Sequence, residues 1–371
     1  MGSSPTKPEF VSVLADKQVK EGDEVNLRCE ANIEEVTAKW EKNGYRLECV
    51  EGKHIKRQSG TTFSLIIRNA AREDEGKYTL SLWNDAGNVS CSAMVTVEFT
   101  EWRTVQWNEG PMITSLKNFK ISNDNIRELR FLLHGPVGAG KSSTINTIKT
   151  IFEGHQFINC LAASDLSGES FTTKYQKYTT RAVPFAFYDL MGIEDGQLKG
   201  VQTADIISAL KGHIPDDYEF KPQAAMCEDN VNYISDPTLN DKIHCLVSVI
   251  AADKVTLMDN DVIQKMKTVR AEASKLGIPQ LVFMTRVDSI CKLTKENLAK
   301  IYRSKKIKEK MEECSTRLGV PMNCIFPLKN YHEETKQNEK LNCLVLEAFT
   351  QAVYSADDYV KKLSRKDQHV E

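Results

Sequence analysis

A glycine-rich run at residues 135–142 constrains the fold of this chain more than any other feature. It reads G-P-V-G-A-G-K-S, which matches the spacing G-x-x-x-x-G-K-S of a loop that wraps phosphate groups. The apolar residues 128–134 before it predict a buried strand, and residues 143–148 predict the start of a helix. A strand, a glycine turn and a helix in this order aim backbone N–H groups and the positive end of the helix dipole at one point. The run therefore predicts a nucleotide-binding α/β domain.

The residue types in this run have separate predicted tasks. Lys141 is expected to reach the β- and γ-phosphates and to act in catalysis, while the Ser142 hydroxyl is expected to bind Mg²⁺. The glycines leave room for the backbone to close around the phosphates. The residues of the run and its helix start that are expected to contact the nucleotide are Gly135, Gly138, Gly140, Lys141, Ser142 and Ser143.

Two later features predict the remaining metal and γ-phosphate contacts. Asp189 and Gly192 follow a hydrophobic strand at residues 184–189 in the order D-x-x-G, so Asp189 is expected to hold Mg²⁺ and the Gly192 N–H to contact the γ-phosphate. A threonine before that strand is expected to complete the metal site and to assist catalysis. Thr172 and Thr173 both fit, and Thr173 is preferred because it lies nearer the strand. A plain turn and a plain strand start are the alternative interpretations.

The base is predicted from Thr285-Arg286-Val287-Asp288, which follows a buried strand at residues 280–284. The pattern resembles [N/T]-K-x-D of GTP-binding proteins, in which the aspartate accepts N–H groups that adenine does not offer. Arg286 replaces the usual lysine, and its planar guanidinium could cover the base or brace the loop. Residues 327–331 with Lys329, after the last predicted strand, are assigned to the base by position alone, with the backbone expected to touch it. The sequence thus predicts GTP or GDP with Mg²⁺, and an ordinary solvated strand end is the alternative.

Hydrolysis is expected to be slow. Small GTPases carry a glutamine directly after D-x-x-G that orients the attacking water. Here that residue is Ile193, which cannot polarise water, and the charge of Glu194 would repel the γ-phosphate. A partner or a second protomer would have to supply the missing group, which makes nucleotide-dependent self-association a further expectation. The alternatives are a non-enzymatic scaffold, with nucleotide bound statically or not at all, and an ATPase, against which Asp288 argues.

Residues 8–98 predict an all-β domain, because short alternating runs are separated by turn signals and show no helical period. Cys29, Trp40 and the corner Asp74-x-Gly76-x-Tyr78 resemble an intermediate-type immunoglobulin domain. The resemblance implies a β-sandwich that binds a protein partner through an exposed sheet edge or loop.

The cysteines of this region depart from the immunoglobulin pattern. Leu80 stands where the family has its second cysteine, so the family's disulfide between the sheets cannot form and Trp40 is expected to pack on the Cys29 thiol and Leu80. Cys49 and Cys91 leave another pairing open. The chain's ten cysteines are scattered without C-x-x-C pairs, which favours free thiols in a cytoplasmic protein.

Charge and hydropathy exclude several classes of partner. With 49 basic and 51 acidic residues the chain carries almost no net charge, so long-range electrostatic attraction to nucleic acid or anionic lipid is not expected. No aromatic side chains interleave its basic stretches as a nucleic-acid platform would require. No run approaches about 18 apolar residues, so a transmembrane span is not expected. Residues 1–6 fit the pattern M-G-x-x-x-[ST], which predicts either N-myristoylation with weak membrane contact or an unmodified polar terminus.

The predicted organisation is an all-β immunoglobulin-like sandwich followed by a three-layer α/β GTPase-like domain built on the phosphate loop. Its parts are residues 8–98, a linker with a short helix at 99–127, the α/β domain at 128–362 with a polar insertion at about 196–241, and a tail at 363–371. Predicted strands at 243–250, 280–284 and 323–326 alternate with a charged helix at 296–318 and a closing helix at 341–362.

The order of these motifs resembles the interferon-induced protein 44 family. The features that carry the resemblance are residues 135–143, residues 329–331, and Trp102 and Trp107 of the linker, and the resemblance covers about residues 100–362. It implies a cytoplasmic, interferon-inducible protein of antiviral immunity. Other members carry a different domain at the N-terminus, so what that domain binds does not transfer to this chain.

Overall fold

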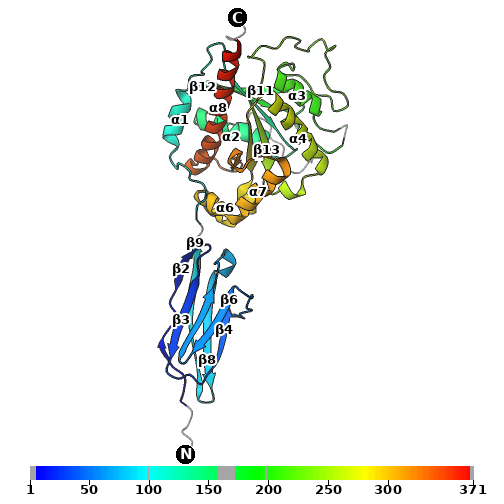
Figure 1. Cartoon of the computed structure of the whole chain (residues 1–371). Coiled ribbons are helices and arrows are strands. Elements are labelled where there is room, and N and C mark those ends of the chain that lie inside the picture. Colours follow the sequence, from blue (N-terminus) through cyan, green and yellow to red (C-terminus); the bar gives the residue numbers. More distant parts are fainter. Residues whose placement is uncertain (1–5, 99, 158–171, 197–198, 368–371) are drawn as a thin grey trace, which may run out of the picture. The chain divides into compact units, whose positions relative to one another are not determined.

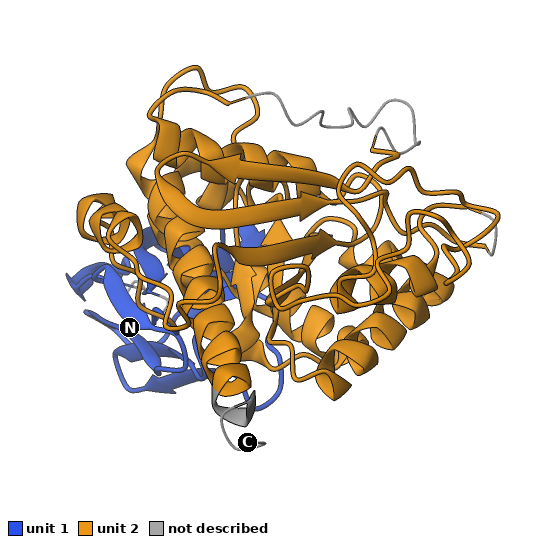
Figure 2. Ribbon diagram, turned by 90° about the horizontal axis from the view of Figure 1, so that it is seen from above, with its two compact units in different colours: residues 1–102 blue, residues 103–371 orange. Residues whose placement is uncertain are grey.

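The computed structural model describes residues 6–98, 100–157, 172–196 and 199–367. The chain forms two compact units, unit 1 at Met1–Trp102 and unit 2 at Arg103–Glu371 (Figures 1 and 2). The predicted myristoylation pattern, Cys160 and most of the expected switch segment before Thr172 lie outside the described residues.

Unit 1 is a sandwich of two sheets. The first sheet has the order β1-β3-β7-β6, and the second has the order β2-β9-β8-β4-β5. The strands of the first sheet are β1 (Phe10–Ser12), β3 (Val25–Ala31), β7 (Thr62–Ile67) and β6 (His54–Ser59). The strands of the second are β2 (Lys17–Lys20), β9 (Gly87–Glu98), β8 (Gly76–Asn84), β4 (Thr37–Lys42) and β5 (Tyr45–Arg46), with a 3₁₀ turn η1 at Arg72–Asp74.

The alternation of apolar residues explains why these strands form a sandwich. In β3 every second side chain from Val25 to Ala31 is buried, and the intervening ones are exposed. Trp40 and Leu80 lie opposite each other in neighbouring strands and share the core with Cys29. The Tyr78 hydroxyl donates to the Asp74 carbonyl oxygen at 2.9 Å, which is the tyrosine corner that the sequence predicts.

Unit 2 is built on one six-stranded sheet with the order β11-β12-β10-β13-β14-β15. All neighbouring pairs are parallel except β11 and β12. Its strands are β10 (Leu129–His134), β11 (Gln176–Thr180), β12 (Val183–Asp189), β13 (Cys245–Ala251), β14 (Gln280–Thr285) and β15 (Ile325–Pro327). The chain leaves β10 toward β12 and then returns past β10 to β13, so the strand order reverses beside β10. Open α/β sheets bind ligands at such a point, outside the carboxyl ends of the strands.

Helices lie on both sides of this sheet (Figure 2). One group consists of α1 (Glu109–Lys117), α2 (Lys141–Glu153) and α8 (Glu339–Asp367), in which α8 contacts α1, α2 and the central strands. A second group consists of α3 (Thr203–Lys211), α4 (Asn260–Lys275) and α7 (Lys305–Leu318), in which α4 contacts both others. Right-handed crossovers in opposite directions place the two groups on opposite faces. The short elements are α5 (Val287–Ile290), α6 (Lys292–Glu296), η2 (Val255–Leu257), η3 (Leu298–Arg303) and η4 (Met322–Cys324).

Several element boundaries differ from the sequence prediction. The charged helix predicted at 296–318 is split at Ser304, whose side chain accepts from the Ile307 N–H and so caps α7. Residues 103–127, predicted as a linker, belong to unit 2: Arg103 donates to the carbonyls of Met322 and Ile325 at 2.8 Å. The closing helix continues to Asp367, beyond the predicted end at 362.

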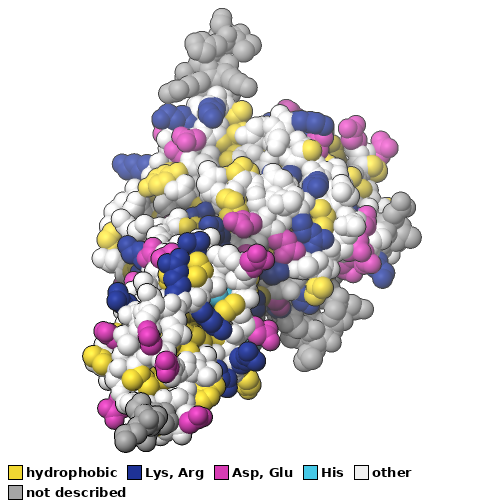
Figure 3. Space-filling model, turned by 60° about the horizontal axis from the view of Figure 1, so that its bottom comes forward, with side chains coloured by type: hydrophobic (Ala, Val, Ile, Leu, Met, Phe, Trp, Pro, Cys, Tyr) yellow, Lys and Arg dark blue, Asp and Glu magenta, His cyan; other side chains and the backbone are white. Residues whose placement is uncertain are grey.

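The surface agrees with the near-neutral composition. On the face drawn in Figure 3, basic and acidic side chains are interspersed over the described residues. Among the helices of the described residues, none combines the length and apolar composition needed to cross a membrane.

Candidate functional site

The glycine-rich loop joins the end of β10 to the start of α2. Gly135 has a φ of +150°, and a Cβ on it would lie 2.1 Å from the carbonyl oxygen of Val249 in β13. Gly138 and Gly140 have φ values of +71° and +95°, and Gly140 is the N-cap of α2. The loop needs glycine at these positions because it presses on the central sheet and turns through conformations that other residues rarely adopt.

The metal-binding candidates meet at the start of α2. The Ser142 hydroxyl donates to Asp189 Oδ2 at 2.5 Å, and Asp189, at the end of β12, is 1% exposed. The Thr172 hydroxyl donates to the same Asp189 oxygen at 3.4 Å, whereas the Thr173 side chain is exposed. Of the two candidates, Thr172 is the one that contacts Asp189, while the Thr173 backbone carbonyl accepts from the Phe220 N–H at 2.9 Å.

These oxygen ligands suit a hard cation. No group of three or more His, Cys, Asp or Glu side chains able to hold a metal ion occurs within the described ranges. Mg²⁺ does not require such a group, since it usually takes one or two carboxylates and completes its octahedron with waters and phosphate oxygens. Ser142 and Asp189 fit that pattern.

Lys141 and the D-x-x-G segment both contact the loop backbone. Lys141 Nζ donates to the carbonyl oxygens of Gly135 and Pro136, each at 3.3 Å. A Cβ on Gly192 would lie 2.4 Å from Val137 Cγ2, so the backbone after β12 runs directly against the loop. The Ile193 N–H donates to the Gly135 carbonyl at 3.0 Å, and the Ile193 side chain is 2% exposed. A buried aliphatic side chain at this position cannot position water.

Residues predicted to read the base also brace the loop. The Thr285 hydroxyl, 1% exposed at the end of β14, donates to the Ala139 carbonyl at 2.6 Å. The Asn330 side-chain amide donates to Thr144 Oγ1 at 3.0 Å and to the Gly140 carbonyl at 3.3 Å. Asn330 lies in the segment that the sequence assigns to the base by position, whereas Thr144 is not a predicted site residue. Only the stretch 329–331 pointed to this region, since the contacts join segments 186 and 190 residues apart.

The charged members of the base-reading group form ion pairs. Arg286, in the left-handed conformation with φ of +58°, lies 3.5 Å from Asp253 Oδ2. Lys329 Nζ lies 3.6 Å from Asp288 Oδ2 and 2.6 Å from Glu334 Oε1. Burial opposes the charge of Lys329, but its hydrogen bond to Glu334 and the nearby carboxylates outweigh burial and raise its pKa. For Glu334 burial likewise acts against the charge, yet the Lys329 bond prevails and lowers its pKa to about 2.

A buried histidine lies directly before the loop. His134 Nε2 is 2.7 Å from the Ser248 hydroxyl of the neighbouring strand. Full burial, with the charges of Lys141 and Arg270 adding to it, lowers the pKa of His134 to about 3. His134 is therefore neutral at physiological pH and supports the loop as a polar link between β10 and β13.

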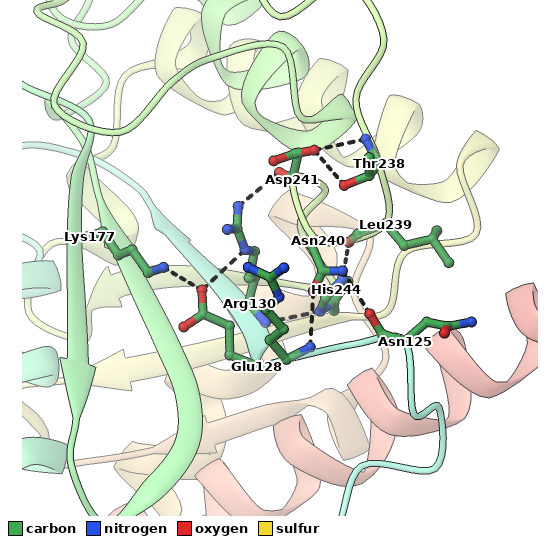
Figure 4. Close-up of polar contacts among 10 residues, drawn as sticks. Asn125, Glu128, Arg130, Lys177, Thr238, Leu239, Asn240, Asp241 and His244 are labelled. Atoms are coloured by element: carbon green, nitrogen blue, oxygen red, sulfur yellow. Dashed lines mark hydrogen bonds and ion pairs between the residues drawn. The ribbon is translucent and has the colours of Figure 1, made fainter.

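A second polar cluster lies at the opposite end of β10 (Figure 4). Glu128 Oε1 accepts from Lys177 Nζ at 2.5 Å and pairs with Arg130 Nε at 3.4 Å. Arg130 also donates to the Asp241 carbonyl at 3.2 Å and, through its backbone N–H, to His244 Nδ1 at 3.1 Å. The cluster sits at the start of β10, whereas the glycine-rich loop follows its end, so the cluster lies outside the site. Its bonds to Asp241 and His244 hold the polar segment before β13 in place.

A cavity of about 170 Å³ adjoins the loop on the side of β13 and α4. Its lining includes Val137 and Ala139 of the loop and Ile250 of β13. Since most of this lining is apolar, the cavity is not assigned to phosphate.

Fold and site together define a class: an immunoglobulin-like β-sandwich joined to an α/β unit whose central strand ends in a glycine-rich loop. The family model for the immunoglobulin I-set domain matches residues 8–97, which confirms the predicted N-terminal domain. The titin M3 domain, a solved structure, is 31% identical, with a TM-score of 0.24, and the match covers 24% of this chain and 96% of that chain.

A stretch of 258 residues is similar to a second group of proteins. Interferon-induced protein 44 of Mus musculus is 32% identical over 258 residues, covering 68% of this chain and 60% of that protein. The Homo sapiens protein of the same name is 30% identical over 258 residues, covering 68% of this chain and 57% of that protein. These similarities support the predicted resemblance to the interferon-induced protein 44 family, and residues 8–97 form an I-set domain, as the sequence predicts. It spans about three fifths of the length of these relatives.

Proposed function

We propose that unit 2 has a phosphate-loop fold and binds a guanine nucleotide with Mg²⁺ at the glycine-rich loop. The observation that carries the proposal is the 2.5 Å contact between Ser142 Oγ and Asp189 Oδ2 at the N-terminus of α2. A hydroxyl and a carboxylate side by side are ligands for Mg²⁺, and the helix N-terminus beside them favours phosphate. The Thr172 hydroxyl contacts the same Asp189 oxygen at 3.4 Å and adds a further hydroxyl beside this pair.

Selection of guanine is assigned to the segment after β14. Asp288 keeps a quarter of its side chain exposed while paired with Lys329, so its carboxylate can accept N–H groups of a base. Thr285 holds the loop rather than the base, because its hydroxyl is buried against Ala139. Arg286 can stack over a base only by leaving Asp253, to which its contact is long at 3.5 Å.

We further propose that the nucleotide is turned over slowly, at no more than about 10⁻² s⁻¹ without a partner. Ile193 supports this because its side chain is buried and its N–H is held by the Gly135 carbonyl. A partner, or a second copy associating when nucleotide is bound, would supply the group that positions water.

The cellular role is proposed from the relatives. They are named interferon-induced, which supports an interferon-induced role in innate antiviral immunity for this chain. Unit 1 would recruit a protein partner, as the I-set fold offers exposed sheet edges in β1 and β5. The cytoplasm is the proposed location.

The test is isothermal titration calorimetry of the full chain with GDP, a non-hydrolysable GTP analogue and ATP, each with Mg²⁺ and with EDTA. The wild type should bind both guanine nucleotides in a Mg²⁺-dependent way and bind ATP at least tenfold more weakly. Lys141→Ala should lose binding, because it removes the amine that folds over the loop. Lys275→Ala, an exposed lysine at the end of α4, is the matched control and should bind normally.

Two outcomes would contradict parts of this proposal. Equal binding of ATP and GTP would refute the role of Asp288. No binding of any nucleotide would favour a scaffold, which the burial of Ile193 and the Arg286–Asp253 pair already support as the second candidate.

A further inference from the structure

The core of unit 1 buries two cysteines on facing strands. Cys29 belongs to β3 of the first sheet and Cys91 to β9 of the second. Both side chains point inward in the alternating burial of their strands, and both belong to one hydrophobic core. The two thiols interact with each other, and this contact raises the pKa of Cys29 and lowers the pKa of Cys91. The two side chains therefore enter the same core from opposite sheets.

The pairing of β8 with β9 explains how this contact arises. The immunoglobulin bridge would need a cysteine at Leu80 of β8, and Cys91 of β9 lies directly opposite Leu80. Trp40 flanks Leu80 on its other side. Relative to the immunoglobulin pattern, the second cysteine thus stands on β9 instead of β8, and its side chain still points into the core that holds Cys29.

We propose that Cys29 and Cys91 form a reversible disulfide between the two sheets, and that the pair is a modification site for low-molecular-weight disulfides of the glutathione type. Cys91 is the entry point because it is 9% exposed, whereas Cys29 is 0% exposed. The hydrogen bond from Cys29 lowers the pKa of Cys91 to about 7 although burial opposes it, and the Leu14 N–H adds to the lowering. Cys91 is therefore the more easily deprotonated thiol of the pair and acts as the nucleophile.

The reaction proceeds in two balanced exchange steps. The Cys91 thiolate attacks one sulfur of the small disulfide, which forms a mixed disulfide at Cys91 and releases one small thiolate. Cys29, whose pKa the contact with Cys91 and burial raise, passes its proton to the released small thiolate and then attacks Cys91 Sγ, which forms the Cys29–Cys91 bond and releases the second small thiolate. The two protons lost by the cysteines leave on the two small thiols. The cysteine pair is oxidised by two electrons and the small disulfide is reduced.

The test uses the full chain, oxidised with glutathione disulfide, alkylated under denaturing conditions and mapped by mass spectrometry. A peptide linked through Cys29 and Cys91 should appear, with mass lower by two hydrogen atoms than the two separate peptides. Dithiothreitol should reverse the link. The exposed Cys49 and the buried Cys245 serve as internal controls and should not acquire an intramolecular link.

The melting temperature of unit 1 in the wild-type chain gives a second readout. Oxidation should raise the melting temperature of unit 1 by roughly 10 °C or more, because the bridge closes a long loop in a small domain. Cys91→Ser should abolish both the link and the shift, and Cys49→Ser should leave both unchanged.

Three results would overturn the proposal. They are a mixed disulfide that stops at Cys91, full alkylation of Cys29 and Cys91 after oxidation, and a link that joins either of them to another cysteine.

Discussion

The closest approach in the candidate site gives its sharpest prediction, the effect of Gly135→Ala. A Cβ at this position would lie 2.1 Å from the Val249 carbonyl oxygen, far inside van der Waals contact. Val249 cannot yield easily, because β13 is held between β10 and β14 in the middle of the sheet. Overpacking of this kind costs about 1–3 kcal/mol, and the positive φ adds about 1–3 kcal/mol of strain. The expected loss for unit 2 is therefore about 2–6 kcal/mol.

Gly154→Ala separates the close approach from the backbone conformation. Gly154 ends α2 with a φ of +78°, and a Cβ there would meet nothing within 4 Å. This variant should lose only the conformational part, about 1–2 kcal/mol. The difference between the two alanine variants then measures the contact with Val249.

Differential scanning calorimetry of the full chain measures both variants. For a unit of this size about 1 kcal/mol corresponds to roughly 2–4 °C. Gly135→Ala should lower the unit 2 transition by roughly 4–24 °C and Gly154→Ala by roughly 2–8 °C. The transition of unit 1 should stay in place and serves as the reference. Equal shifts for the two variants would refute the contact, and an unshifted Gly135→Ala would refute the loop geometry as well.

Three further predictions concern unit 2. Thr285→Val should destabilise it by about 1–3 kcal/mol in urea unfolding and weaken nucleotide binding, because the Ala139 carbonyl loses its donor; an unchanged affinity would contradict the bracing role. Burial lowers the pKa of His134 to about 3 and of His244 to about 4, while the unfolded chain takes up these protons near pH 6.5. Urea unfolding should therefore show stability that is complete above about pH 6.5 and is lost as pH falls toward these values, by up to about 1.4 kcal/mol per pH unit for each histidine; a flat profile would count against both buried sites. Ile193→Gln should destabilise unit 2 without raising GTP turnover in a phosphate-release assay, because the side chain is buried; faster turnover would show that it reaches the phosphates.

Local chemistry explains which parts of the site were predictable. The glycines, Lys141 and Ser142 lie in one run with a strand before and a helix after, so their geometry follows from adjacent residues. The bond of Thr285 to Ala139 joins residues 146 positions apart, and only the order of the strands brings them together. Periodicity carries no information about such contacts. It also missed β11, a short polar strand at the sheet edge.

Other features had local signals that the predictions did not use. Ser304 could have been recognised as a helix cap inside the charged run, since its side chain accepts from the Ile307 N–H three residues later. The turn between Asn84 and Gly87 fixes the register of β8 and β9, and counting back from it places Cys91 opposite Leu80. That count would have favoured Cys91 over Cys49 as the cysteine facing Cys29, because Cys49 is exposed.

The segment after Asp189 connects the geometry of the loop with the slow turnover that we propose. At one end the Ile193 N–H is held by the Gly135 carbonyl at 3.0 Å. At the other end Lys265 of α4 donates to the carbonyls of Glu194 at 2.7 Å and Gly196 at 2.5 Å, and Asp261 accepts from the Gly196 N–H at 2.9 Å. A segment tied at both ends can rearrange around a γ-phosphate only after these bonds break. Under the proposed function, a partner that competes for Lys265 or Asp261 would release this segment directly.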